Sequence, residues 1–282
     1  MLLPAVAYIG ALVGLPFVMA FVYAVGDVRV GSVGYRFVGL ANFASVLASP
    51  AFRKALQNSL VFTVSSQFLV LVCSLSLALA LQHPFRGRPL IRFLILLPWA
   101  APISIGSIGW KWILDSLYSV VNWVLIAFHL VKPFDAPMWL GEPKLAMLSV
   151  IVVNVWRIMP FSTVVILAGL TAIPKDIPEA AAVDGAGFFR TLFEITLPML
   201  RPILNVSLLF GLIFSSTDMT VVYILTRGGP YDTTQVLPSL AFFAGILGGD
   251  LSEGAALSLF LVPVLAGVAF LMLRVARRTE SA

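Results

Sequence analysis

The feature that most constrains this chain is a series of apolar segments, each about as long as a membrane is thick. No charged residue occurs between Lys54 and Arg86, and residues 254–273 carry none either. The hydrocarbon core of a bilayer is about 30 Å thick, and an apolar helix needs about 20 residues to cross it. Backbone N–H and C=O groups find no water in lipid, so such segments have to be helices. The sequence therefore predicts an all-α integral membrane protein.

Composition supports a lipid-solvated chain. Hydrophobic residues make up 60% of the sequence and charged residues 11%, whereas soluble domains have about 45–50% and about 25%. A large soluble core would still need a charged surface, so a soluble globular protein is excluded. The net charge of +5 does not indicate nucleic-acid binding, because the basic residues lie where the apolar segments end.

Six segments meet the length test or come close to it. They are residues 2–25, 58–81, 90–114, 145–172, 202–225 and 254–273. Two further uncharged stretches, residues 116–131 and 233–249, are short for a crossing and are interpreted as interfacial or re-entrant helices. About six transmembrane helices are predicted, or seven or eight if these stretches also cross.

The sequence contains no recognisable pattern of catalytic or metal-ligating residues. The single cysteine, Cys73, cannot form an internal disulfide, and His83 and His129 have no Cys partners for a metal site. No Gly-Lys pair occurs, so the phosphate-binding loop G-x-x-x-x-G-K-[ST] is missing. We expect no catalytic residue, no metal site and no cofactor in this chain. Residues 1–23 lack the basic start and small-residue cleavage site of a signal peptide and are predicted to be a retained span.

The segment between the fourth and fifth spans is neither short nor shapeless. Residues 173–201 predict two short helices joined by a glycine, a unit that we call the elbow. Asp176 is expected to cap the first helix, and Gly185 to end it in the left-handed conformation. A second helix over about residues 188–195 is expected to stop at Pro198.

The elbow carries the pattern Glu-Ala-Ala, three residues, Gly, nine residues, Ile-x-Leu-Pro. This pattern resembles the EAA signature of binding-protein-dependent ABC transporter permeases. The resemblance implies a type I ABC importer permease fold, a single permease domain over residues 1–282, and an elbow that docks on a cytoplasmic ATPase subunit. The residues expected to couple to the ATPase are Glu179, Ala180, Ala181, Asp184, Gly185, Phe188, Phe189, Ile195, Leu197 and Pro198. For Phe188, Phe189 and Phe193, packing against the permease's own span ends is the alternative.

Three other segments resemble the first of two sugar-type permeases. They are residues 37–43 (FVGLANF), 156–161 (WRIMPF) and 223–230 (YILTRGGP). The resemblance implies a second homologous permease subunit, two copies of an ATPase that bind ATP and Mg²⁺, an extracytoplasmic solute-binding protein and a sugar substrate moved by alternating access. It also implies an inner-membrane location with cytoplasmic termini. Charge alone favours that orientation only weakly, because the two sides carry similar numbers of basic residues.

Polar residues inside the spans are the candidates for substrate contact, because charges within a membrane usually face a cavity or each other. Asn154 and Arg157 share one helix face at spacing i, i+3, and Phe161 follows one turn later. Asp218 lies near the middle of the fifth predicted span, and Tyr223 follows it. A sugar needs hydrogen-bonding groups together with an aromatic face. The alternative for Arg157 and Asp218 is a buried ion pair that joins two helices.

Two other functions remain open. A permease of the same fold for glycerol phosphate or another polar solute would need several cations in its cavity, whereas Arg157 is the only basic residue deep in a span. An ion-coupled secondary carrier would depend on Asp218 as its intramembrane carboxylate, and it would leave the elbow unexplained.

Overall fold

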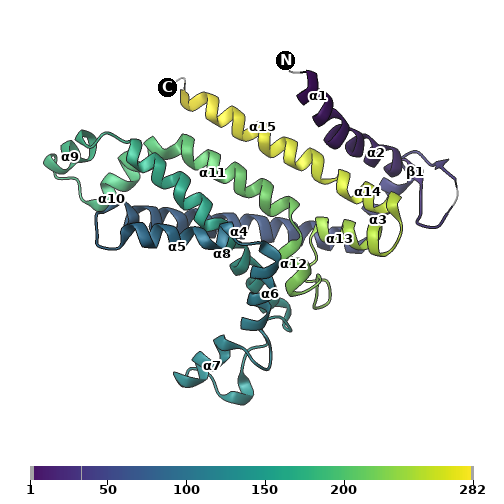
Figure 1. The fold of residues 1–282 in the computed structure, drawn as a ribbon, viewed down its shortest axis with the longest axis horizontal. Coiled ribbons are helices and arrows are strands. Elements are labelled where there is room, and N and C mark those ends of the chain that lie inside the picture. The colour runs from purple at the N-terminus through teal and green to yellow at the C-terminus, as the bar shows by residue number, and fades with distance from the viewer. Residues whose placement is uncertain (1–2, 33, 281–282) are drawn as a thin grey trace.

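The computed structural model describes residues 3–32 and 34–280. Its helices run mostly along the long axis of the molecule, and α6 and α7 project to one side (Figure 1). The elements of the first half are α1 (Leu3–Ile9), the π-helical turn η1 (Gly10–Gly14), α2 (Leu15–Ala24), β1 (Gly26–Asp27), β2 (Arg36–Phe37), α3 (Ala41–Ala48), α4 (Pro50–Gln82), α5 (Arg88–Ala100), α6 (Ile103–Ile113), α7 (Val120–Ala127) and the 3₁₀ turn η2 (Pro133–Asp135). Those of the second half are α8 (Pro143–Ala172), α9 (Asp176–Val183), α10 (Phe188–Thr191), the π-helical turn η3 (Leu192–Thr196), α11 (Leu197–Thr217), α12 (Thr220–Leu225), α13 (Leu237–Phe242), the π-helical turn η4 (Phe243–Leu247), α14 (Leu251–Leu259) and α15 (Leu261–Glu280).

The predicted all-α membrane fold is confirmed. Five helices of the described chain are long and apolar enough to cross a membrane, and the count is six if the bent pair α5–α6 is one broken span. The two short stretches form α7 and the α13–η4 unit (Leu237–Leu247), neither of which reaches spanning length. The chain is therefore a multi-pass membrane protein with five or six crossings among its described residues.

The third predicted span is not one continuous helix. Between α5 and α6 the axis turns by 97°. Ala101 takes an extended conformation (φ −73°, ψ 145°) directly before Pro102, because the proline ring disfavours a helical residue in front of it. Pro98, in contrast, lies inside α5 without ending it.

The fifth predicted span also differs from expectation. The helix starts within the elbow and continues from Phe188 through η3 to Thr217. Pro198 does not stop it, because the preceding π-helical turn rearranges the hydrogen bonds that the missing proline N–H would otherwise break. The span then ends eight residues before its predicted limit, and α12 follows as a separate short helix.

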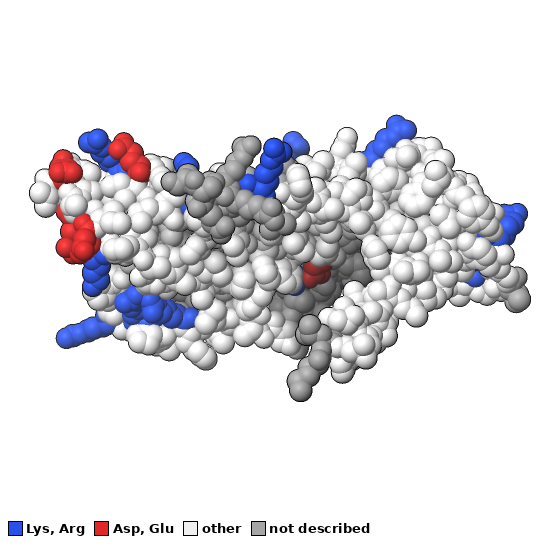
Figure 2. Space-filling model, turned by 90° about the horizontal axis from the view of Figure 1, so that it is seen from above, with Lys and Arg blue, Asp and Glu red and all other residues white. Residues whose placement is uncertain are grey.

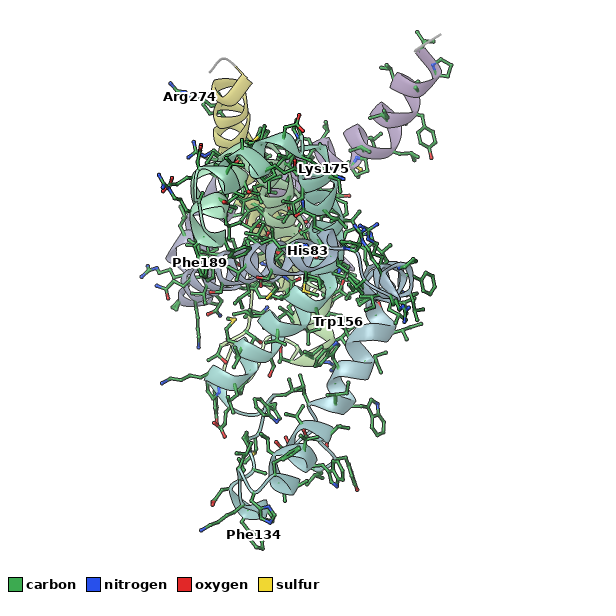
Figure 3. The ribbon with its side chains drawn as sticks, turned by 90° about the vertical axis from the view of Figure 1, so that its left-hand side faces the viewer. His83, Phe134, Trp156, Lys175, Phe189 and Arg274 are labelled. Carbon is green, nitrogen blue, oxygen red and sulfur yellow. The ribbon has the colours of Figure 1, made fainter. Side chains whose placement is uncertain are left out.

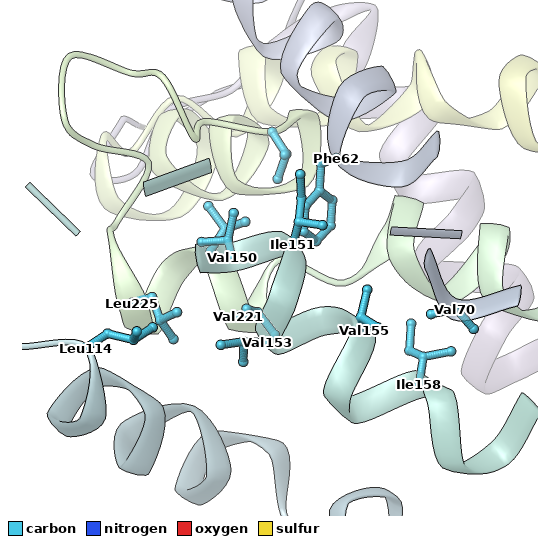
Figure 4. Close-up of a cluster of buried hydrophobic side chains, with 12 residues drawn as sticks. Phe62, Val70, Leu114, Val150, Ile151, Val153, Val155, Ile158, Val221 and Leu225 are labelled. Atoms are coloured by element: carbon cyan, nitrogen blue, oxygen red, sulfur yellow. The ribbon is translucent and has the colours of Figure 1, made fainter. Parts of the chain in front are cut away.

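Helix α8 is the centre of the bundle, and 61% of its most apolar 18-residue stretch is buried. It packs along α4, and a cluster of buried side chains joins both helices to α12 (Figure 4). Val150, Val153 and Ile158 belong to this cluster and are almost completely buried. Lipid tails are as apolar as these side chains, so the cluster stabilises the fold by close packing rather than by removal from water.

The N-terminal span is the least embedded of the five continuous spans in the described chain. None of its most apolar 18-residue stretch is buried, and Figure 1 shows α1 standing apart from the other helices, whereas α2 packs against α14. Only its far end is fixed. The β1–β2 hairpin that follows is held to the start of α14 by the ion pair Arg29–Asp250 at 3.2 Å and by the Val28 amide, which donates to Ser252 Oγ at 2.7 Å.

Candidate functional site

A polar cluster lies where α8 crosses the end of α11. Asn154 is buried, and its Nδ2 donates to Ser215 Oγ at 3.0 Å. One turn further along α8, Arg157 forms an ion pair with Asp218, and the two side chains remain 14% and 21% exposed. Three of the residues predicted to contact substrate, Asn154, Arg157 and Asp218, thus come together.

The end of α11 is what positions Asp218. The residue takes an extended conformation (φ −95°, ψ 120°), and its Oδ1 accepts the amide hydrogen of Thr220 at 2.7 Å. The carboxylate thereby satisfies the first amide of α12, whose N-cap residue is Met219, and its other oxygen stays available for Arg157. A charged residue in mid-span is thus placed at a break between helices rather than within a regular helix.

Helix α4 completes the cluster from the other side. The Nε2 atom of Gln67 donates to Ser215 Oγ at 3.3 Å, and Thr63 Oγ1 lies 3.5 Å from Ser216 Oγ. Gly211 makes room for Gln67, since a Cβ atom at that glycine would lie 2.1 Å from Gln67 Oε1. The sequence analysis did not select these residues, because a glycine and serines on an apolar helix are usual at helix–helix contacts.

An aromatic cluster lies beside the polar one. Phe161 stacks on Trp99 with ring centroids 5.0 Å apart and an interplanar angle of 26°, and it contacts Phe210 at 5.1 Å. Phe214 contacts both Trp99 and Phe210. Phe161 was predicted for a substrate site, whereas its partners were missed because they come from α5 and α11, far away in the sequence.

Tyr223 lies apart from the other four predicted substrate residues. It packs edge-on against Phe242, with centroids 5.5 Å apart, and lines a cavity of about 630 Å³ between α6 and α12. Lys111, Asp115 and Arg227 also line this cavity. Hydrogen bonds from the backbone amides of Tyr118 and Leu117 lower the pKa of Asp115, so the cavity holds charges of both signs. The break at Asp218 turns α12 away from α11, which explains the separation of Tyr223.

The elbow forms as a helix, a glycine and a second helix. Gly185 ends α9 with φ +79°, as predicted, and the Ala186 amide donates to the Ala181 carbonyl at 2.9 Å. The predicted capping role of Asp176 is wrong. Asp176 is the first residue of α9, and the N-cap position is occupied by Lys175, whose side chain makes no capping bond.

The outer surface of the elbow is exposed. Phe188, Phe189 and Phe193 are 63%, 72% and 62% exposed, so most of each side chain is free of the permease's own span ends. Phe188 also lines a cavity beside the ends of α4 and α8, which keeps part of the alternative open for that residue. Glu179 and Asp184 are exposed as well. Figure 3 looks onto this end, where Phe189 points outward, and Figure 2 shows acidic side chains gathered over it.

The inner surface of the elbow rests partly on the bundle. Ala181 is buried, and Ile195, Leu197 and Pro198 are half-buried. A cavity of about 540 Å³ separates α9 and α10 from the ends of α4 and α8. The elbow therefore touches the bundle at few points and presents its acidic and aromatic side chains outward.

Among residues 3–32 and 34–280, no three His, Cys, Asp or Glu side chains lie close enough together to hold a metal ion. The interactions of the candidate site are ion pairing, hydrogen bonding and aromatic stacking.

Known proteins resemble this chain over most of its length. Residues 71–281 match the family described as binding-protein-dependent transport system inner membrane component. The trehalose/maltose transport system permease protein of Thermococcus litoralis is 36% identical over 241 residues, which cover 86% of this chain and 80% of that protein. The sn-glycerol-3-phosphate transport system permease protein of Yersinia pestis is 28% identical over 257 residues, or 91% of this chain and 85% of that protein. A bacterial ABC transporter that imports alginate has the same fold, with a TM-score of 0.84 at 22% identity over 99% of this chain and 94% of that one.

Proposed function

The chain belongs to the family of binding-protein-dependent transport system inner membrane components, and on this premise we propose that it is the sugar-carrying permease subunit of an ATP-driven importer. The observation that carries the proposal is the polar and aromatic site formed by α8 and α11. Asn154, Arg157 and Asp218 supply donors and acceptors, and Phe161 with its neighbours supplies an aromatic face. This is the combination that a sugar requires.

A neutral sugar fits this site better than glycerol phosphate does. The positive charge of Arg157 is already matched by Asp218, so the pair offers no net positive charge to a phosphate group. The trehalose/maltose relative supports a sugar substrate as well. Glycerol phosphate is retained as the second candidate because a glycerol-phosphate permease is also similar to this chain.

The elbow is proposed to couple the permease to a separate ATPase subunit. Its exposed phenylalanines offer a compact apolar surface, and Glu179 and Asp184 offer ion-pair anchors. ATP and Mg²⁺ are bound by that partner, and this chain carries no catalytic residue. The elbow end, and both termini with it, face the cytoplasm in this proposal, and residues 1–282 act as a single permease domain.

The remaining partners of the proposed importer are a second homologous permease subunit and an extracytoplasmic solute-binding protein. The binding protein delivers the sugar to a cavity between the two permeases. Closure of the ATPase dimer moves the elbows, and the cavity opens alternately to either side of the membrane. Discrete packed states of this kind suit a site held by an ion pair between two helices.

Reconstitution of the complete importer tests this proposal. Uptake of maltose, trehalose and sn-glycerol-3-phosphate is measured in liposomes with the cognate binding protein and ATP. We expect ATP-dependent uptake of a sugar and a loss of that uptake in Asp218→Asn and in Arg157→Gln. Arg53→Gln is the charge-matched control, because Arg53 is exposed near the start of α4.

Two results contradict the proposal. Unchanged uptake and unchanged substrate-stimulated ATP hydrolysis in both site variants would show that the polar cluster is structural only. ATP hydrolysis by the purified chain alone would show that the motor is not a separate subunit.

A further inference from the structure

Two arginines near the start of α5 are placed unusually for surface cations. Arg88 and Arg92 are spaced i, i+4 and so share one face of the helix. The Nε atom of each is buried and has no hydrogen-bond partner within the described chain. Neither arginine takes part in an ion pair with a described carboxylate, and Arg92 makes only a long contact of 3.5 Å from Nη2 to the Leu81 carbonyl oxygen. Buried donors without acceptors indicate that an acceptor from outside the chain belongs there.

An apolar groove begins at Arg92, one turn along α5 from Arg88. It has a volume of about 230 Å³ and runs between α4, α5 and α8. Its lining residues are Leu81, Arg92, Ile95, Leu96, Val164 and Leu167, together with Thr163. Arg92 is its only charged residue, and no residue of α5 is buried. The groove therefore opens onto the exposed apolar surface of α5.

The start of α5 adds a third feature. Gly87 precedes the helix with φ +87° and provides no side-chain cap, and Pro89 occupies its first turn. The first amides of an uncapped helix carry partial positive charge. Figure 2 shows further Lys and Arg side chains gathered at this end of the molecule, and Arg86 in the preceding loop is exposed.

We propose that this is a binding site for an anionic phospholipid. The phosphate group accepts hydrogen bonds from Arg88 and Arg92, and one acyl chain lies in the groove toward Ile95 and Val164. Arginine suits this task because its guanidinium group donates two parallel hydrogen bonds to a phosphate. A basic pocket between spans at one membrane face is a recognised arrangement for anionic headgroups.

The site fits a lipid rather than a soluble phosphate compound, because its charged and apolar parts are continuous. A free phosphate would use the arginines and leave the groove empty. A lipid satisfies the buried donors and fills the groove at the same time, and other large apolar side chains of α5, among them Phe93 and Leu97, are exposed.

Lipid titration of the purified complete importer tests the proposal. Native mass spectrometry in detergent follows the binding of phosphatidylglycerol and of phosphatidylcholine. We expect wild type to prefer phosphatidylglycerol. Arg88→Gln with Arg92→Gln lowers its affinity for phosphatidylglycerol roughly 25-fold, since each basic residue near an anionic lipid contributes about fivefold. Arg53→Gln, at the other end of α4, leaves the affinity unchanged.

A second variant separates the groove from the charges. Leu96→Trp fills the groove but keeps both arginines, and we expect it to weaken phosphatidylglycerol binding as well. Equal binding of the two lipids by wild type would overturn the proposal. Displacement of the lipid by inorganic phosphate, or unchanged binding in Leu96→Trp, would also overturn it, because the site would then recognise phosphate alone. None of these results depends on which solute is imported.

Discussion

The elbow and the polar cluster of α8 place the residues predicted to be functional in opposite environments. The elbow is continuous in sequence, exposed, and has few contacts with its own chain. The cluster draws Gln67, Asn154 and Ser215 from three helices and satisfies most of its polar groups internally. The difference suggests that elbow residues matter for binding to another subunit, whereas cluster residues matter for the fold and the substrate together. Substitutions in the two regions should therefore separate assembly from stability.

The largest effect is expected from breaking the ion pair of the cluster. Arg157→Leu leaves the Asp218 carboxylate without its partner in a mostly buried place, and we expect a loss of about 3 kcal/mol in stability. Adding Asp218→Asn removes the stranded charge but keeps an oxygen to accept the Thr220 amide. The double variant should regain most of the stability and still fail in uptake. Thermal unfolding of the importer in detergent measures the first effect, and liposome uptake measures the second. A double variant as unstable as the single one would contradict the prediction.

A smaller loss is expected at Gly211, the glycine that lets α11 pack closely against Gln67. Gly211→Ala places a Cβ atom in the space occupied by the Gln67 side chain, and we expect destabilisation of about 1–3 kcal/mol. Gly267→Ala on α15 is the matched control, because nothing lies within 4 Å of a Cβ atom at that position. The control should be neutral or slightly stabilising, since alanine favours a helix more than glycine does. Equal melting temperatures of the two variants would show that the Gln67 side chain can adopt another conformation at no cost in stability.

The smallest change in stability is expected at the elbow. Phe189→Ala removes a side chain that is 72% exposed, so the stability of the chain should change by less than about 0.5 kcal/mol. Its affinity for the ATPase subunit should fall about tenfold, as expected for an aromatic residue at the centre of an interface. Size-exclusion chromatography with titrated ATPase measures the affinity. A large drop in melting temperature with unchanged assembly would remove the contrast between the two regions.

Sequence patterns predicted those features that depend on neighbouring residues. The left-handed glycine at position 185 and the membrane spans follow from local chemistry, and both are present. The helix through Pro198 was not predicted, because the π-helical turn that accommodates it depends on hydrogen bonds along the whole helix. The break at Pro102 had a local signal in the extended preference of the preceding residue, but hydropathy averaged over the segment hid it.

The candidate site shows the same division. Asn154 and Arg157 share a helix face by spacing alone, so their proximity was predictable. Their pairing with α11 depends on how α4, α8 and α11 cross, and the close approach of α8 to α11 at Gly169 needs coordinates to be seen. Tyr223 was grouped with the others because the fifth span was predicted to be straight through Asp218.

The uninterrupted helix from Phe188 to Thr217 has one further consequence. At about 1.5 Å per residue its length is roughly 45 Å, and it begins beside the exposed phenylalanines and ends one residue before Asp218. If the elbow couples to an ATPase as proposed, we expect a tilt imposed at the Phe188 end to reach the ion pair with Arg157 without passing through a loop. The π-helical turn near the start of the helix is where we expect such a tilt to bend it.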